Sequence, residues 1–187
     1  MALLDHNTKS IVAKLVYWGP AGSGKWTNLE YIHAKTAPAD RPRGEKANSI
    51  GLPLKMPDIR GWSTTFNLLR VPSDGAWTRY VFDEIPGNGC DGVVFVADAS
   101  PHAGAANVAS LELLSAELAA RGFDLAKLPL VFQYNKLDVA GAATGQQLAA
   151  QLNPRRVPEV EAIATQGIGV FDALKAAARS ILMELRR

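Results

Sequence analysis

The stretch Gly19-Pro-Ala-Gly-Ser-Gly-Lys-Trp-Thr27 decides the fold class of this 187-residue chain. It matches the pattern of a phosphate-binding loop, in which glycines let successive backbone N–H groups point at phosphates and the lysine reaches the β- and γ-phosphates. The pattern continues with Ser or Thr, whose hydroxyl binds Mg²⁺, but the residue here is Trp26. The predicted phosphate-binding residues are Gly19, Ala21, Gly22, Ser23, Gly24, Lys25, Trp26 and Thr27.

The segments on both sides of this loop are those that the motif requires. Residues 11–17 form a β-branched and aromatic run that predicts a strand, and helix-permissive sequence extends from Lys25 to about Lys35. Further strands are predicted at 49–56, 62–71, 92–98, 128–134 and 160–164. Helices are predicted at 108–118 and 146–152 and from Val170 onward.

This alternation predicts an α/β fold with one domain over residues 1–187. The expected architecture is a P-loop domain with a mostly parallel six-stranded sheet and helices on both faces. Ligands of such sheets bind at the carboxyl ends of the strands.

A second motif, Asn135-Lys-Leu-Asp138, follows the predicted strand at 128–134. Asn-Lys-x-Asp is typical of guanine recognition: the carboxylate of Asp138 would accept hydrogen bonds from N1–H and the 2-amino group, and the stem of Lys136 would cover the ring. Ala164-Thr165, after the next predicted strand, could offer backbone N–H groups to guanine O6. The two motifs in this order predict a site for GDP or GTP.

The chain resembles the MglA group of bacterial Ras-like small GTPases almost from end to end. The resemblance is carried by Lys14-Leu-Val-Tyr-Trp-Gly-Pro20, Thr27-Asn-Leu-Glu-Tyr-Ile32, Asp58-Ile-Arg-Gly61, Cys90-Asp-Gly-Val-Val-Phe-Val-Ala-Asp98, Gln133-Tyr-Asn-Lys136 and Gly169-Val-Phe-Asp-Ala-Leu-Lys175. It implies that the α/β domain is a single P-loop G-domain and a nucleotide switch that sets cell polarity and motility in gliding bacteria. It also implies a Roadblock-type protein as activating partner.

The metal-binding positions depart from that family. Trp26 replaces the Mg²⁺-binding threonine, and the side chain of Thr27 points roughly 100° away around the helix. The family's first switch supplies a second threonine, but the only hydroxyl between Ala37 and Trp62 is that of Ser49. We therefore expect impaired Mg²⁺ binding, with Ser49 and Thr27 as the remaining candidate ligands.

The second switch lacks the glutamine that orients the attacking water in such GTPases. One register, anchored on Asp58-Ile-Arg-Gly61, puts Asp74 at that position; a rival register through Glu84-Ile-Pro-Gly-Asn88 puts Asn88 there. The first register preserves the family's length between strands and is the one we favour. Arg60 and Arg79 are candidates for an internal arginine finger.

Composition excludes several other classes of protein. A net charge of +2 from 20 basic and 18 acidic residues, with no long run of one sign, argues against nucleic acid as the partner. The single cysteine, Cys90, fits a reducing compartment and the role of a small buried residue. We find no signal peptide, membrane span or lipidation motif, and expect a cytoplasmic protein with no direct membrane anchor.

Three functions remain. The first is a guanine nucleotide-binding pseudo-GTPase that acts through a partner, either a Roadblock-type protein or another MglA-like GTPase. The second is an active GTPase in which Ser49, Thr27 or a partner completes the site. The third is a nucleotide-free scaffold in which Trp26 fills the phosphate pocket.

Overall fold

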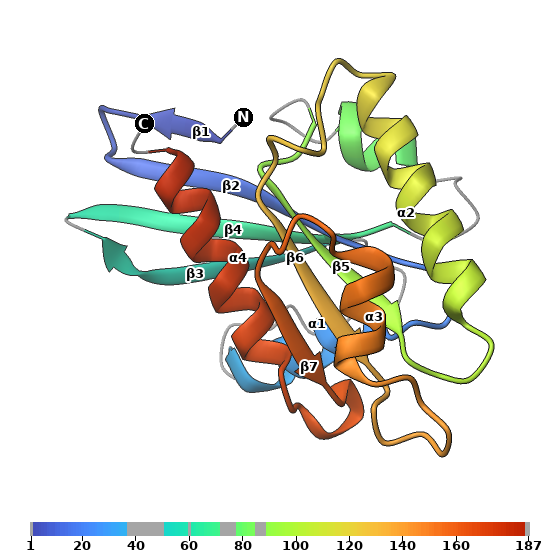
Figure 1. The fold of residues 1–187 in the computed structure, drawn as a ribbon. Helices are drawn as coiled ribbons and strands as arrows, with labels where there is room; N and C mark the ends of the chain where they lie inside the picture. The colour runs from blue at the N-terminus through green and yellow to red at the C-terminus, as the bar shows by residue number, and fades with distance from the viewer. Residues whose placement is uncertain (1, 37–50, 60, 72–77, 85–88, 186–187) are drawn as a thin grey trace.

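The computed structural model describes residues 2–36, 51–59, 61–71, 78–84 and 89–185, and within them the chain forms one twisted sheet flanked by helices (Figure 1). The strands are β1 (Leu3–Asp5), β2 (Ser10–Trp18), β3 (Gly51–Ile59), β4 (Trp62–Arg70), β5 (Gly92–Asp98), β6 (Leu130–Asn135) and β7 (Glu159–Ala162). Their order is β3-β4-β2-β5-β6-β7, with β1 paired to β2. The predicted fold class, a mostly parallel α/β sheet, is confirmed.

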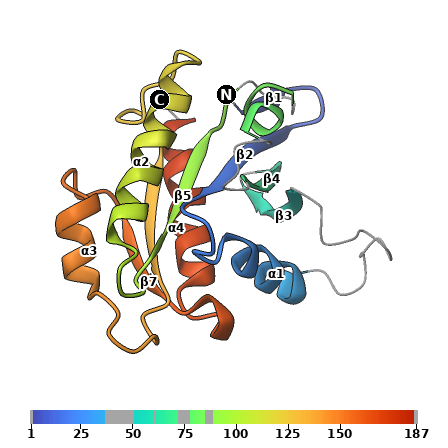
Figure 2. The same cartoon turned by 90° about the vertical axis from the view of Figure 1, so that its right-hand side faces the viewer.

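Within the described ranges, four helices and two short helical turns accompany these strands. The helices are α1 (Lys25–Thr36), α2 (Gly104–Ala119), α3 (Gly145–Leu152) and α4 (Val170–Glu184). A π-type turn, η1 (Tyr80–Glu84), precedes β5, and a 3₁₀ turn, η2 (Ala164–Gln166), follows β7. Figure 2 shows the chain passing from the end of β2 through a loop into α1.

The two faces of the sheet carry separate apolar cores because side chains along each strand alternate between faces. Leu15 and Tyr17 of β2 pack with apolar side chains of α1 and α4. Val16 and Trp18 point to the other face and pack with α2, α3 and η1. β5 is fully buried, as expected for a strand covered on both faces.

Besides shifts of a few residues at the ends of other elements, the structure differs from the predicted elements at three places. It adds a seventh strand, β1, which pairs antiparallel with β2 and whose three residues are all exposed, so that no apolar pattern indicates it. The strand predicted at 160–164 ends at Ala162, because Ile163 bridges to Ile168 and Ala164 begins η2. η1 was not predicted, and its five residues follow a wider helical path than the α-helical pattern describes.

The sheet's parallel pairings position the candidate site. β2 runs parallel to β4 and β5, β5 to β6, and β6 to β7, so the carboxyl ends of these five strands lie at one edge of the sheet. The segments that follow these ends begin at Gly19, Val71, Ala99, Lys136 and Ile163. The phosphate-binding loop and the guanine motif therefore share this edge.

Candidate nucleotide-binding site

The phosphate-binding loop joins β2 to α1 in the position that the sequence predicted. All three of its glycines have a positive φ, and two of them, Gly19 at 146° and Gly24 at 100°, are packed tightly against neighbours. A Cβ at Gly19 would collide with the backbone oxygen of Val96, and one at Gly24 with the side-chain amide of Asn135. Because α1 begins at Lys25, its free N–H groups and its positive dipole end lie at the loop.

Lys25 lies inside this loop. Its ammonium donates hydrogen bonds to the backbone oxygens of Gly19, at 2.6 Å, and Pro20, at 2.7 Å. Burial, and to a smaller extent the charge of Arg70, lowers the pKa of the Lys25 ammonium to about 8. A buried cation that faces backbone oxygens in a loop of this shape can be recruited by a phosphate.

Asn135 connects all three predicted loops. Its amide nitrogen donates to the oxygen of Ser23 in the phosphate loop, at 2.7 Å, and its amide oxygen accepts from the backbone N–H of Ala164, at 2.9 Å. Both bonds are buried, so they hold the phosphate end and the base end of the site in a defined relation.

This connection corrects one expectation about Ala164. Its N–H was expected to face guanine O6, but it is the donor to Asn135. Thr165 is exposed at the same turn and remains the candidate for O6.

Gln133 and Asn28, which were not predicted as site residues, support the phosphate loop by hydrogen bonds. The Gln133 side chain donates to the Oδ1 of Asn28 at 2.8 Å, and Asn28 donates to the oxygen of Gly24 at 2.9 Å. All of these groups lie in the buried interior between β6 and α1. A glutamine within the apolar run of β6 was the available signal, since a buried amide requires a polar partner.

The Asn135 to Asp138 motif carries two charged side chains: Lys136 forms an ion pair, and Asp138 is exposed. The Lys136 ammonium contacts the Asp98 carboxylate at 2.6 Å. Burial alone would raise the pKa of Asp98, but hydrogen bonds from Lys136 and Ser100 outweigh it and lower the pKa. Asp138 is exposed, so its carboxylate is accessible to a ligand.

Trp26 and Arg70 meet beside the loop. The Arg70 guanidinium lies 4.6 Å from the centre of the Trp26 ring, a cation–π contact. Arg70 is the last residue of β4 and pairs in register with Tyr17, two residues before Gly19. Its Nε is buried and has no hydrogen-bond partner among the described residues.

The Mg²⁺ that the resemblance implies does not fit these described residues. At the position of the metal-binding hydroxyl there is an indole that carries a guanidinium, which repels a metal cation. Within the described ranges, no group of three or more His, Cys, Asp or Glu side chains could hold a metal ion. Thr27 is half-buried on α1, one position after Trp26.

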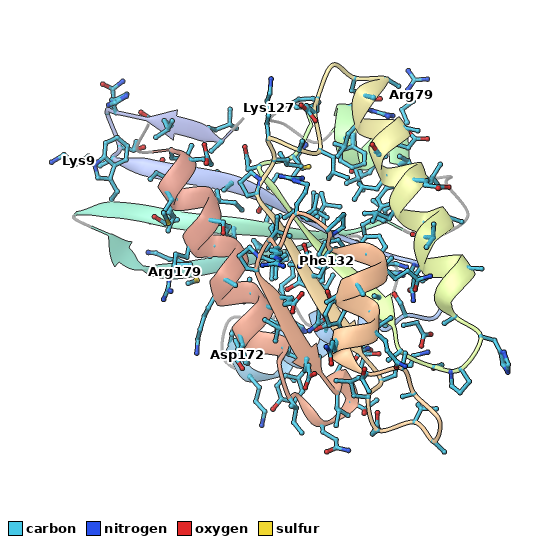
Figure 3. The ribbon with its side chains drawn as sticks, in the orientation of Figure 1. Lys9, Arg79, Lys127, Phe132, Asp172 and Arg179 are labelled. Carbon is cyan, nitrogen blue, oxygen red and sulfur yellow. The ribbon has the colours of Figure 1, made fainter. Side chains whose placement is uncertain are left out.

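Several predicted residues cannot be compared with the structure. Ser49, Asp74, Asn88 and Arg60 lie outside the described residues. Arg79 is described and exposed, and Figure 3 shows it at the edge of the molecule near the carboxyl end of α2, away from the loop. This position does not support an arginine finger at residue 79.

Comparison with known proteins gives the family. No protein-family model matches the chain. The mutual gliding-motility protein MglA of Myxococcus xanthus (strain DK1622) is 40% identical over 198 aligned residues, which cover 100% of this chain and 99% of that protein. The chain belongs to the MglA group of Ras-like small GTPases.

Membership in the MglA group implies that the chain binds a guanine nucleotide. The phosphate loop and the Asn135 to Asp138 motif, which the hydrogen bonds of Asn135 connect, are the candidate residues for that site. Among the described residues, no helix combines the length and apolar character needed to cross a bilayer.

Proposed function

We propose that this MglA-group protein binds GDP and GTP, hydrolyses GTP very slowly, and acts through protein partners in motility and cell polarity. One observation carries the proposal: Asn135 joins a phosphate loop that keeps its glycines and Lys25 to a complete guanine motif, while Trp26, in contact with Arg70, occupies the position of the metal-binding hydroxyl. Binding groups are therefore present beside altered catalytic groups.

Guanine selectivity follows from the exposed carboxylate of Asp138. A carboxylate accepts hydrogen bonds from N1–H and the 2-amino group of guanine, and adenine has neither donor. A site built around such bonds rejects a ligand that lacks the donors, because its own polar groups are left unpaired.

Slow hydrolysis follows from the metal position. Mg²⁺ neutralises charge on the transferred phosphoryl group, and a positioned glutamine orients the attacking water. Trp26 provides no metal ligand, and neither Asp74 nor Asn88 is a glutamine.

The described residues next to the second switch favour the register through Asp74. Val71 donates its N–H to the oxygen of Tyr17 at the carboxyl edge of the sheet. The rival segment is followed by Asp91, whose N–H donates to Lys14 in the middle of β2, and by the amino end of β5. The first register thus begins nearer the phosphate loop.

The cellular role rests on the relative. The similar Myxococcus protein is named for gliding motility. A member of this group that cannot reset by hydrolysis can still act by being bound or unbound. We therefore propose a Roadblock-type protein or another MglA-like GTPase as partner, and the cytoplasm as its location.

One observation favours a different function, that of a nucleotide-free scaffold. Lys25 reaches back to the oxygens of Gly19 and Pro20 within its own loop, so its charge is already partly compensated. Retention of no guanine nucleotide by the purified protein, with none bound on re-addition, would support this alternative.

The test combines selectivity with turnover. The wild-type protein should bind GDP in preference to ADP, and Asp138→Asn should shift preference toward xanthosine diphosphate, because an amide donor suits the 2-oxo group of xanthine. Multiple-turnover hydrolysis with Mg²⁺ should stay at or below about 10⁻⁴ s⁻¹. A rate near 1 s⁻¹ with a co-purifying partner would show an active GTPase instead.

A further inference from the structure

We propose that Arg70, held on the indole of Trp26, is the cation that contacts the β- and γ-phosphates in place of Mg²⁺, so that guanine nucleotide binds without a metal. This inference rests on the proposed nucleotide binding and adds to it the means of charge compensation. It concerns two residues from separate elements, β4 and α1.

Arg70 approaches the loop from a rigid position. β4 runs parallel to β2, with Arg70 opposite Tyr17, and the N–H of Val71 donates to the oxygen of Tyr17. Two residues later the phosphate loop begins at Gly19. The end of one strand therefore places a cation beside the loop that leaves the end of its neighbour.

The contact with Trp26 orients this cation. At 4.6 Å from the ring centre, the guanidinium lies over the indole, where the electron-rich face attracts it. A guanidinium keeps its charge at any physiological pH, and its planar donors match phosphate oxygens. Trp26, which cannot bind a metal, thus orients the cation that replaces the metal.

The Nε–H of Arg70 is a buried hydrogen-bond donor that has no acceptor among the described residues. A buried donor left unpaired is destabilising, so an acceptor that enters beside it is favoured. A phosphate oxygen in the loop is such an acceptor.

A second cation converges on the same place. Arg70 lies close enough to Lys25 to contribute to the lowering of the lysine pKa to about 8, after the larger effect of burial. Two like charges beside the amino end of α1 repel one another until an anion joins them. The arrangement therefore selects a polyphosphate.

If Arg70 replaces Mg²⁺, the protein can bind nucleotide and still lack what rapid hydrolysis requires. A guanidinium supplies one positive charge and hydrogen bonds, which hold a phosphate. It cannot gather oxygen ligands around itself as Mg²⁺ does, and the proposed site provides no metal to align the phosphoryl group for attack. Nucleotide affinity should therefore be independent of Mg²⁺.

The experiment compares Arg70→Gln with Arg79→Gln, a variant with the same charge change at an exposed position away from the loop. Wild type and both variants are stripped of nucleotide, checked by thermal unfolding, and titrated with GDP and with guanosine in EDTA. Arg70→Gln should weaken GDP binding about 10- to 100-fold and leave guanosine binding unchanged. Arg79→Gln should change neither. Trp26→Leu, which removes the stack, should give a smaller loss for GDP alone.

Each other outcome contradicts the inference in a different way. Equal or tighter GDP binding by Arg70→Gln would mean that Arg70 blocks the pocket. An equal loss of affinity for guanosine and for GDP would mean that Arg70 has a structural role. Wild-type binding that requires Mg²⁺ would mean that a metal ion, and not Arg70, compensates the phosphate charge. Wild-type protein that binds neither ligand would overturn the proposed function itself.

If Arg70→Gln does not fold, Arg70→Lys is the second variant, because it keeps the charge but not the planar stack. It should lose affinity for GDP and not for guanosine. Unchanged GDP affinity in that variant would overturn the role of the stack.

Discussion

Asn135 is the residue on which the geometry of the site depends most. Its amide donates to Ser23 in the phosphate loop and accepts from Ala164 after β7, while Asp138 in the same motif is exposed. We therefore propose that two members of one short motif have different tasks, Asn135 within the protein and Asp138 toward the base.

Replacing Asn135 should reduce both stability and binding. Asn135→Ala leaves the oxygen of Ser23 and the N–H of Ala164 buried without partners. We expect the free energy of unfolding to fall by about 2 to 4 kcal/mol. Chemical denaturation measures this change. Asp138→Ala is the control: it should weaken GDP binding but leave stability within about 0.5 kcal/mol of wild type, and a similar stability loss in both variants would contradict the division of tasks.

The pKa of Lys25 predicts how binding depends on pH. In the free protein this pKa is lowered to about 8 by burial and then by Arg70, and phosphates beside the ammonium should raise it again. A group whose pKa is higher in the complex favours binding while it is protonated. GDP affinity should therefore be greatest below about pH 8 and fall by up to about tenfold per unit above it.

Titrations of GDP between about pH 7 and pH 9 measure this dependence. Lys25→Arg is the matched variant, because a guanidinium stays charged over this range. Its affinity should change less with pH than that of wild type. Identical slopes for the two proteins would assign the pH dependence to another group.

The residues of the site were only partly predictable. The loop and the guanine motif follow fixed spacings, so their positions could be read from the sequence. Arg70 and Asn28 could not, because their roles arise from contacts between β4, β6 and α1 that no local spacing encodes. Gln133 gave a signal as a glutamine within an apolar run, but its partner Asn28 could not be read from the sequence. The commitment of the Ala164 N–H to Asn135 is likewise a tertiary contact.

Among the helices and strands, those with a clear apolar pattern were the ones that could be predicted from the sequence. β5 and β6 are continuous buried runs, and α1 and α4 begin where the sequence indicated, at Lys25 and Val170. β1 has no such pattern because its residues are exposed; the turn that follows it, in which Asp5 accepts the N–H of Asn7, leads the chain into β2. The end of β7 was misplaced because the Ile163 to Ile168 bridge is a turn contact.

The junction of β2 and α1 depends on close packing at Gly24. A Cβ there would collide with the amide of Asn135, which is itself held by two buried hydrogen bonds. Gly22 also has a positive φ, 71°, but a Cβ there would meet nothing within 4 Å. The two glycines thus share a backbone requirement and differ in packing.

Alanine at each position separates these effects. Gly22→Ala should cost about 1 to 2 kcal/mol of unfolding free energy, from backbone strain alone. Gly24→Ala should cost at least about 2 kcal/mol more and weaken GDP binding, because Asn135 must move. Chemical denaturation of both variants checks this, and equal costs would mean that the Asn135 amide yields without loss.

At the scale of the whole molecule, the parallel sheet gathers every described part of the site at one edge. The loop follows β2, Arg70 ends β4, Asp98 ends β5 and Asn135 ends β6. A chain with a net charge of only +2 thus concentrates two cations, Lys25 and Arg70, where phosphates of a guanine nucleotide would lie. The fold of an MglA-group GTPase is retained, and we propose that the chain itself supplies the charge that a metal would bring.

Metal-free binding is best measured by an equilibrium titration of nucleotide-free protein with fluorescent GDP and GTP, each with Mg²⁺ and with EDTA. We predict that both nucleotides bind with dissociation constants that agree within about twofold between Mg²⁺ and EDTA. Binding of GTP that tightens by more than about tenfold with Mg²⁺ would contradict it, because a metal would then hold the phosphates that we assign to Lys25 and Arg70.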